Sequence, residues 1–388
     1  MVTYPEWESM TLGDLGHIQM CRRIFQSQTK DYGAIPFYKI STFGGKADAY
    51  ISKELYEKYK LLYPYPERGE ILISAAGTIG KTVVFDGKDG YFQDSNIVWL
   101  KTDNRIEKNY LNWFYRSFPW EALEGTTIQR LYNSIILGTH IDLPSIPEQK
   151  KIVETLSSFD KYIDNLSELI EKKKNIREGA LEDLMTCRTR VMNANSEWCE
   201  GILSDVCKVY DGTHQTPKYT INGIKFVSVE NISDLYASDK YISAKDFERD
   251  FKIWPELGDV LMTRIGDIGT ACVVESNELM AFYVSLALFK NIKIDSQFLR
   301  YFIESSLFQN ELDDRTLHHA TPKKINKGEI GKCKVKYPAD VKEQKAIAEI
   351  LKSMDKEIIN LEEEREKMIQ IRDGAMDDLL TGRVRLEF

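Results

Sequence analysis

A long internal repeat limits what this chain can fold into. The segment that starts at Glu148 reads EQKKIVETLSSFDKYIDNLSELIEKKKNIREGALEDLMTCRTRV, and a second copy that starts at Glu343 reads EQKAIAEILKSMDKEIINLEEEREKMIQIRDGAMDDLLTGRVRL, with a constant offset of 195 residues. The preceding segments correspond more loosely, as GEILISAAGTIGKTVV (69–84) does with GDVLMTRIGDIGTACV (258–273). Self-similarity at a fixed offset indicates copies of one structural unit. We therefore expect two half-molecules, each with a divergent block of about 150 residues and a nearly invariant block of about 45.

Both nearly invariant blocks have the pattern of long amphipathic helices. Apolar residues recur at alternating spacings of three and four, with Glu and Lys between them, which is typical of coiled coils. In the first block these apolar residues are Ile152, Leu156, Phe159, Ile163, Leu166 and Ile170. Each helix would span roughly 39 residues, or about 58 Å, and would need a partner to cover its apolar stripe. We expect the two helices to pair antiparallel, with one globular domain at each end and a pseudo-two-fold axis between them.

This arrangement would make the helices a ruler that holds two globular domains apart. A rigid separation of that kind suits a target with two separated half-sites. The same periodicity is also compatible with a coiled coil that only dimerises or tethers. The predicted boundaries are 1–147 and 194–342 for the two globular domains, and 148–193 and 343–388 for the two helical segments.

Each helical block carries a glycine at the same point of the repeat, Gly179 in the first and Gly374 in the second. A glycine costs a helix about 1 kcal/mol relative to alanine. Two explanations are open, namely a close approach of two helix backbones or a contact point for a partner protein. Gly382 is predicted to end the second helix, and Cys187 replaces it in the first copy.

The two divergent blocks are predicted to be mixed α/β domains. In the second block IKFVSVENI, DVLMTRI, ACVVES and YVSLALFK have the character of strands and SQFLRYFIESSLFQNELDD that of a helix. The first block follows the same order, with YLNWFYRSFPWEALEG in the helical place.

One stretch of the first block, from Ala75 to Gly80-Lys81-Thr82, fits a relaxed nucleotide-binding loop. The second copy has Thr270 and Ala271 where Lys81 and Thr82 stand, so the phosphate-binding pair is absent from it. β-branched and aromatic residues follow Lys81, whereas a phosphate loop must open a helix. We interpret the stretch in both copies as strand, glycine-containing turn and strand, and we do not expect ATP binding.

Composition restricts the functional classes. A net charge of -8 argues against a uniformly basic nucleic-acid coat, so a polyanion site would be a local patch. The six cysteines form no C-x-x-C pair or Cys/His cluster with zinc-like spacing and are expected to be reduced, with no metal bound. The N-terminus lacks the features of a signal peptide, and no run approaches the roughly 18 apolar residues of a membrane span. A cytoplasmic location is expected.

Local cationic and polar segments are the candidate DNA contacts. The stretch from Arg315 to Lys342 is rich in Lys and Arg, which would release counterions from a duplex. DGTHQTPKYT (211–220) and TRIGDIGT (263–270) offer hydroxyls, amides and Arg264, whose guanidinium could take a bidentate guanine contact. The alternatives are a solvated lysine-rich loop and an ordinary capped turn. The candidate DNA-contacting residues are Lys81, Gln129, Arg130, Thr213, His214, Lys218, Arg264, His318, His319, Lys323, Lys324 and Lys327.

Together these features resemble the DNA sequence-specificity subunit of type I restriction-modification systems. The resemblance spans the whole chain and rests on the half-molecule repeat, the PSIPEQKKI and PADVKEQKAI entries to the long helices, the IREGALEDLM and IRDGAMDDLL ends, and the DGTHQTPKYT and G-[DE]-[IV]-L stretches of the divergent blocks. It implies two target-recognition domains, each reading one half of a bipartite, interrupted DNA site. It also implies two adenine methyltransferase subunits docked on the helices, joined by ATP-driven translocating nuclease subunits. The predicted partner contacts are Gly179, Arg177, Gly374 and Arg372.

A subunit of this kind would have no catalysis of its own. The sequence contains no Asn-Pro-Pro-aromatic methylation motif, Gly-rich cofactor loop, true phosphate loop or metal-ligand array. No cofactor is therefore expected on this chain, and S-adenosylmethionine, ATP and magnesium are expected on the partner subunits. A stand-alone DNA-binding regulator and a purely structural tether remain the alternatives.

Overall fold

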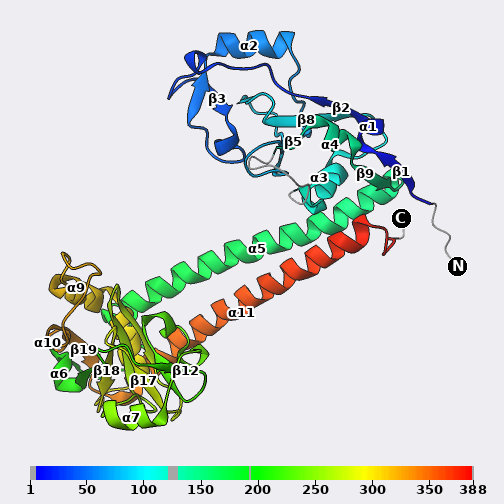
Figure 1. Ribbon diagram of the computed structural model, residues 1–388. Coiled ribbons are helices and arrows are strands. Elements are labelled where there is room, and N and C mark those ends of the chain that lie inside the picture. The colour runs from blue at the N-terminus through cyan, green and yellow to red at the C-terminus, as the bar shows by residue number, and fades with distance from the viewer. Residues whose placement is uncertain (1–5, 121–129, 192–193, 387–388) are drawn as a thin grey trace. The chain divides into compact units, whose positions relative to one another are not determined.

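The computed structural model describes residues 6–120, 130–191 and 194–386 and divides into two compact units (Figure 1). Unit 1 contains Met1–Ser167 and Glu364–Phe388, and unit 2 contains Glu168–Glu363. Each unit therefore combines one divergent block with one half of each long helix.

Unit 1 is built on a four-stranded antiparallel sheet with the order β2-β8-β5-β6, a smaller sheet with the order β4-β3-β7, and the pair β1-β9. Its strands are β1 (Glu8–Thr11), β2 (Gly16–Gln19), β3 (Ile35–Tyr38), β4 (Ala49–Ile51), β5 (Ile71–Ser74), β6 (Thr82–Val84), β7 (Tyr91–Phe92), β8 (Ile97–Thr102) and β9 (His140–Leu143). Its shorter helices are α1 (Leu12–Leu15), α2 (Lys53–Leu62), α3 (Lys108–Ser117) and α4 (Asn133–Gly138), with 3-10 turns η1 (Gln26–Gln28) and η2 (Ile40–Thr42).

Unit 2 repeats this design, with sheets of the order β11-β18-β15-β16 and β12-β14-β13-β17 and the pair β10-β19. Its strands are β10 (Trp198–Ile202), β11 (Lys208–Asp211), β12 (Tyr219–Thr220), β13 (Ile224–Val227), β14 (Tyr241–Ile242), β15 (Val260–Ile265), β16 (Asp267–Val273), β17 (Met280–Phe282), β18 (Leu286–Lys290) and β19 (Lys334–Pro338). Its shorter helices are α6 (Leu203–Val206), α7 (Ala244–Asp250), α8 (Ser296–Glu304), α9 (Ser306–Arg315) and α10 (Lys327–Ile330), with 3-10 turns η4 (Val229–Asn231) and η5 (Leu235–Ala237).

The sheets confirm the prediction of two mixed α/β domains and of the strand, turn and strand at residues 69–84. β5 and β6 form an antiparallel hairpin around the glycine-containing turn, as β15 and β16 do in unit 2. No helix opens after Lys81, so this stretch lacks the geometry of a phosphate loop. The single helix expected over SQFLRYFIESSLFQNELDD is two helices, α8 and α9, which are separated at Ser305.

The two nearly invariant blocks form α5 (Ile146–Met185) and α11 (Val341–Leu380), each 40 residues long. Both helices begin two residues before the predicted boundaries. Within unit 1 their paired halves run antiparallel and lie side by side (Figure 1), because Asp160 bonds Arg372 and the later residue Tyr162 bonds the earlier residue Glu364. The halves in unit 2 are joined in the same way, for example by Lys173 and Glu357.

Each unit closes one hydrophobic core over the ends of both long helices. An amphipathic helix is stable in water only when its apolar face is buried, and here the domain buries that face at the helix ends. The long-helix residues buried in the core of unit 1 are Ile152, Leu156, Leu379 and Leu380. Those of unit 2 are Leu181, Leu184, Met185, Ile347, Ala348 and Leu351. The divergent block and the repeated block are therefore parts of one folded unit.

A buried carboxylate near the start of each long helix binds an arginine that follows the end of the other. Glu148 has no exposed surface, and its Oε2 accepts hydrogen bonds from Nη2 of Arg385 (2.8 Å) and from the indole of Trp7 (3.2 Å). In unit 2 both oxygens of Glu343 accept hydrogen bonds from Nη2 of Arg190 (2.8 Å). Glu148 and Glu343 occupy the same repeat position, and so do Arg385 and Arg190, which accounts for the Glu at the helix starts and the Arg after the helix ends.

The glutamine that follows each of these carboxylates ties the long helix to its domain. Gln149 Oε1 accepts a hydrogen bond from the N–H of Glu107 at the start of α3 (2.7 Å), and Gln344 Oε1 accepts one from the N–H of Asp295 at the start of α8 (2.7 Å). Both amide groups also donate to a nearby proline carbonyl (2.8 and 2.7 Å). The two buried side chains are thus paired, as buried polar groups must be.

The long helices end with a residue in the left-handed backbone region. Gly382 follows α11 with φ +71°, which confirms it as the predicted helix stop. Cys187 follows α5 with φ +62°, a conformation that costs a non-glycine residue roughly 1–2 kcal/mol. The first copy has the same backbone turn with a cysteine in place of the glycine.

We predict that Glu148→Gln destabilises unit 1 by about 3 kcal/mol, because the substitution leaves the Arg385 guanidinium partly buried without its carboxylate. Urea unfolding combined with hydrogen exchange would measure the loss and locate it. The control is Glu154→Gln, which removes an exposed ion pair to Lys151 on the same helix. Equal unfolding curves for the two variants would contradict the prediction.

Candidate nucleic-acid interface

The candidate DNA contacts of unit 2 gather at one end of the sheet β11-β18-β15-β16. The end of β11 lies opposite the start of β18, where Asp211 pairs with Ala287, and the start of β18 lies opposite the end of β15, where Leu286 pairs with Thr263. The loops that leave these strand ends therefore emerge together. We call them the unit 2 loop surface, which comprises residues 211–218, 264–270 and 316–327.

Arg264 joins the three parts of the unit 2 loop surface. The residue is 5% exposed, and its guanidinium lies 2.6 Å from Asp211 Oδ1 and donates through Nε to the carbonyl of Ile325 (3.0 Å). With so little of its surface exposed, Arg264 is not accessible to a base in this conformation. The structure therefore gives Arg264 an internal, loop-fixing role in place of the free guanidinium on which the predicted guanine contact depends.

Exposed cations surround this fixed centre. The backbone of Lys324 pairs with Ile265, and the carbonyl of Lys323 accepts a hydrogen bond from Gly266. The side chains of Lys323 and Lys324 are exposed, and Lys327 lies 3.7 Å from Asp211 while its side chain stays 47% exposed. The lysine-rich stretch is thus held against the β15–β16 turn.

The histidines and the segment 211–220 lie on the same surface, and hydrogen bonds hold only some of them. His318 Nε2 is 3.0 Å from the carbonyl of Asp313, and His319 is exposed. Backbone hydrogen bonds join Thr213 to Phe282 (3.1 Å) and Val284 (2.9 Å). The segment after Thr213 turns outward, and the exposed candidates on it are His214 and Lys218.

Unit 1 has the same loops at the same end of its sheet. Gln19 at the end of β2 lies opposite Trp99, and Ile97 at the start of β8 lies opposite Ser74 at the end of β5. The backbone of Arg130 pairs with Ala76, as Lys324 pairs with Ile265 in unit 2. The unit 1 loop surface comprises residues 20–25, 75–81 and 130. Gln129 lies outside the described residues.

The two loop surfaces share a backbone frame and differ in side chains. Arg264 donates its N–H to the carbonyl of Ser285 (2.9 Å) and accepts from Ile325 (3.0 Å). Ala75 makes the matching bonds, to Asn96 (2.7 Å) and from Leu131 (2.9 Å). The frame holds in unit 1 although a methyl group stands where unit 2 has a guanidinium.

The candidate cations of unit 1 have different environments. Lys81 Nζ donates to the carbonyl of Phe43 (2.6 Å), so it is bound within its unit although its side chain is exposed. Arg130 is exposed and donates one weak hydrogen bond to the carbonyl of Ser95 (3.2 Å).

The structure adds two cations to this surface that sequence reasoning missed, Arg22 and Arg23, which follow the end of β2. They stand where unit 2 has the DGTH segment after β11. The adjacent pair of arginines is visible in the sequence, but the weak similarity between the segments hid their common position.

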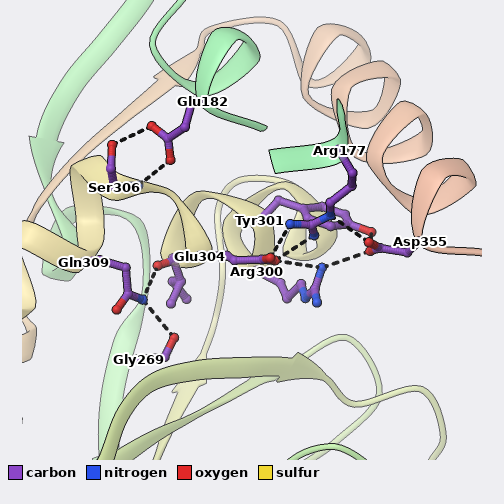
Figure 2. Close-up of polar contacts among 10 residues, drawn as sticks. Arg177, Glu182, Gly269, Arg300, Tyr301, Glu304, Ser306, Gln309 and Asp355 are labelled. Atoms are coloured by element: carbon purple, nitrogen blue, oxygen red, sulfur yellow. Dashed lines mark hydrogen bonds and ion pairs between the residues drawn. The ribbon is translucent and has the colours of Figure 1, made fainter. Parts of the chain in front are cut away.

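Arg177 and Arg372, predicted as partner contacts, are bound inside their own units. Figure 2 shows Arg177 between Glu304 and Asp355, with Nε 2.8 Å from Asp355 Oδ1 and Nη2 2.9 Å from Glu304 Oε2. Arg372 makes the repeat-related bond to Asp160 (3.1 Å). These ion pairs tether the domain and the two helix halves to one another, and contact with a partner stays a prediction.

The charged groups of these ion pairs, Arg177 in unit 2 and Asp160 in unit 1, are stabilised by their partners. Burial disfavours the charged form of Arg177, but hydrogen bonds to Glu304 and Asp355 outweigh it and raise the pKa of the guanidinium. Burial would raise the pKa of Asp160, yet Arg116 and Arg372 hold that pKa below its ordinary value. Any stability that Asp160 contributes is therefore present near neutral pH and lost as the pH falls below about 4.

Gly179 and Gly374 do not lie at a close approach of two backbones. A Cβ atom added to either glycine would meet no heavy atom within 4 Å, and both positions are exposed. The first of the two explanations offered by the sequence is therefore wrong, and the open space leaves room for a partner.

The described residues include no group of three or more His, Cys, Asp or Glu side chains that could hold a metal ion. Across the same part of the chain, no helix combines the length and apolar character that a membrane crossing requires.

We predict that Arg264→Ala lowers the stability of unit 2 by about 2 kcal/mol, because Asp211 and the carbonyl of Ile325 both lose a charged donor. Residues 316–327 should lose protection against hydrogen exchange. Arg249→Ala, which removes an exposed arginine from α7 of the same unit, should change neither quantity. Unchanged protection in Arg264→Ala would show that the loops hold without it.

Comparison with known proteins gives one family for most of the chain. The family model described as type I restriction modification DNA specificity domain matches residues 4–175 and again 195–370. A putative type I restriction enzyme specificity subunit of Haemophilus influenzae is 52% identical over 158 residues, which is 40% of this chain and 41% of that protein. The type I restriction enzyme MjaVIII specificity subunit of Methanocaldococcus jannaschii is 27% identical over 78% of this chain and 76% of its own length.

Solved structures share the fold. The S subunit of the type I restriction-modification system from M. genitalium aligns with a TM-score of 0.58 at 18% identity, over 96% of each chain. The HsdS subunit from Thermoanaerobacter tengcongensis aligns with a TM-score of 0.51 at 16% identity, over 98% of each chain.

Proposed function

Because this chain belongs to the family of type I restriction-modification specificity subunits and has two recognition domains, we propose that it reads a bipartite, interrupted DNA site and presents it to adenine methyltransferase subunits. Unit 1 would read one half-site and unit 2 the other. Translocating nuclease subunits would join the same complex.

The observation that carries this proposal is the pair of loop surfaces with one backbone frame and different side chains. A shared frame places the loops alike in both domains, since Ala75 and Arg264 make the same backbone hydrogen bonds. Different side chains on that frame suit two different base sequences, because base edges are distinguished by donors and acceptors at fixed positions. Two unrelated half-sites are what such a pair of surfaces would select.

Recognition would combine electrostatic anchoring with base contacts. Lys323 and Lys324 are exposed and would bind phosphates, which fixes the register of the domain on the duplex. His214 and Lys218 are exposed on the segment 211–220 and would contact base edges. Arg264 would act indirectly, by holding these loops in one arrangement before DNA binds.

The outer faces of the long helices are the proposed docking sites for the methyltransferase subunits. Ile176 exposes 58% and Ile371 45% of its surface, and each lies three residues before the open glycine of its copy. Residues three apart share a helix face, so each copy presents an apolar contact beside a gap. The repeat supplies two such faces, which fits two copies of one partner.

Catalysis would belong to the partners. The chain is proposed to bind no cofactor itself, and S-adenosylmethionine, ATP and magnesium would be held by the methyltransferase and nuclease subunits. A flipped target adenine would be methylated in the partner's site, because modification of a stacked base requires its extrusion.

We predict that the double variant Gly179→Trp and Gly374→Trp folds normally but binds the methyltransferase at least tenfold more weakly, because the indoles fill the open space where the partner backbone would approach. Gly179→Ala should instead raise helix stability by up to about 1 kcal/mol. Glu178→Trp, about 100° around the helix, is the control. Pull-down with the methyltransferase measures binding, and undiminished binding by the double variant would count against these faces.

The proposed function is tested by co-expressing the chain with its methyltransferase and mapping methylated adenines in the host genome. We expect one motif with two half-sites and a constant spacer. Replacing residues 194–342 with the block of another family member should change one half-site and keep the other. DNA binding without any methyltransferase partner would favour a stand-alone regulator, and no sequence-dependent affinity would favour a structural tether.

A further inference from the structure

We propose that Arg22, Arg23 and Phe25, together with the end of α2, form the principal DNA-contacting element of the first recognition domain. This inference rests on the proposed function and names the residues that carry it in unit 1. Unit 1 otherwise offers few free cations on its loop surface, since Lys81 is bound to the Phe43 carbonyl.

The segment after β2 presents these side chains on a fixed backbone. Cys21 and Ile24 are buried in the core that contains β3 and β7, which anchors the chain on both sides of the two arginines. The N–H of Phe25 donates to Gln28 Oε1 (2.9 Å), which fixes the entry to the turn η1. Arg22, Arg23 and Phe25 are therefore exposed on a fixed backbone, so ligand binding would cost little backbone conformational entropy.

Both arginines lack an acidic partner among the described residues. The Arg22 guanidinium lies over the Tyr63 ring, 5.2 Å from its centroid, and the Arg23 guanidinium lies over the Phe25 ring at 5.8 Å. Contact with an aromatic face leaves the edge N–H donors of a guanidinium free for a phosphate or for the guanine edge. The net charge of the chain is -8, so two adjacent arginines without acidic partners are an uncommon local concentration of positive charge.

Exposed apolar groups flank the two cations. Phe25 is 60% exposed, and the end of α2 adds Leu61 at 85% and Leu62 at 59%. The contact between Arg22 and Tyr63 brings the two segments together. Apolar side chains beside arginines are the combination that inserts between base steps while the cations hold the phosphates.

The position of the segment in the fold selects DNA as its partner. β2 ends at the same end of the sheet at which β5 and β8 meet the loop of Arg130. The corresponding strand of unit 2, β11, ends in the DGTH segment of the unit 2 loop surface. The two domains would thus use one location with different chemistry, arginine and aromatic groups in unit 1 and hydroxyl, imidazole and amine groups in unit 2.

The test is the double variant Arg22→Ala and Arg23→Ala in the full-length chain bound to its methyltransferase. The probe is a pool of duplexes with a randomised central region, and binding is measured across a series of salt concentrations and by sequencing the selected duplexes. We expect at least a tenfold loss of affinity and a decrease of about 1.8 in the slope of log affinity against log salt, which corresponds to two lost phosphate contacts. The half-site read by unit 1 should lose definition while the other half-site is kept.

Three further variants separate the contributions. Arg22→Lys with Arg23→Lys should keep the salt slope and weaken sequence selection, because the charge remains and the planar donor set is lost. Phe25→Ser should weaken binding without changing the slope. Arg105→Ala with Lys108→Ala removes two cations beyond the opposite end of the same sheet and should change neither quantity.

An affinity, slope and selected sequence equal to the wild type in the double alanine variant would overturn the inference while leaving the proposed function intact. Loss of methyltransferase binding with unchanged DNA binding would assign the patch to a protein partner and also overturn it. A wild-type complex that selects no sequence at all would overturn the proposed function, and this inference with it.

Discussion

The ion pair between the start of one long helix and the residues after the end of the other is the interaction on which each unit depends. Glu148 is removed from water in unit 1, and Arg385, donated by the far end of the chain, compensates its charge. The repeat places Glu343 and Arg190 in the same relation in unit 2. A buried carboxylate without its cation is strongly unfavourable. Neither domain can therefore pack correctly against the start of its long helix without an arginine from the other repeat. The duplication is therefore built into the fold, since each folded unit needs residues from both copies.

This dependence separates two sets of residues that meet different physical demands. The glutamates at the helix starts and the arginines after the helix ends must match one another across the repeat, because each buried carboxylate is paired with an arginine of the other copy. On the loop surfaces the backbone hydrogen bonds are common to both units, and only unit 2 adds the side-chain bonds of Arg264. Ala75 and Arg264 occupy the same frame position with entirely different side chains. A scaffold of this kind can change what it recognises without changing how it folds.

Some cationic side chains of the loop surfaces bind groups within their own unit, and others are free to bind a ligand. Counting Lys and Arg in the sequence does not distinguish the two kinds. Arg264 is bound to Asp211 and to a backbone carbonyl, and Lys81 donates a hydrogen bond to the Phe43 carbonyl. Arg22 and Arg23 contact only aromatic rings through their guanidiniums in the part of the chain that is described. Arg264, which the sequence singles out for a guanine contact, is thus buried and paired. Arg22 and Arg23, which the sequence does not single out, are exposed. The same division applies to the helices, where Arg177 and Arg372 bind internal carboxylates and the two glycines face open space.

The sequence alone determined the duplication, the two mixed α/β domains, the helix lengths and the family, because periodicity and repeated motifs are properties of the chain order. It also excluded the phosphate loop, since Lys81 and Thr82 have no counterpart in the second copy. Only the tertiary structure decided which polar residues are paired, because pairing depends on partners far away in the chain, 237 residues for Glu148 and Arg385. The tertiary structure also shows that Gly179 borders open space and that Arg22 follows β2, the strand equivalent to β11. Periodicity reports which face a residue occupies, and only packing reports what stands opposite it.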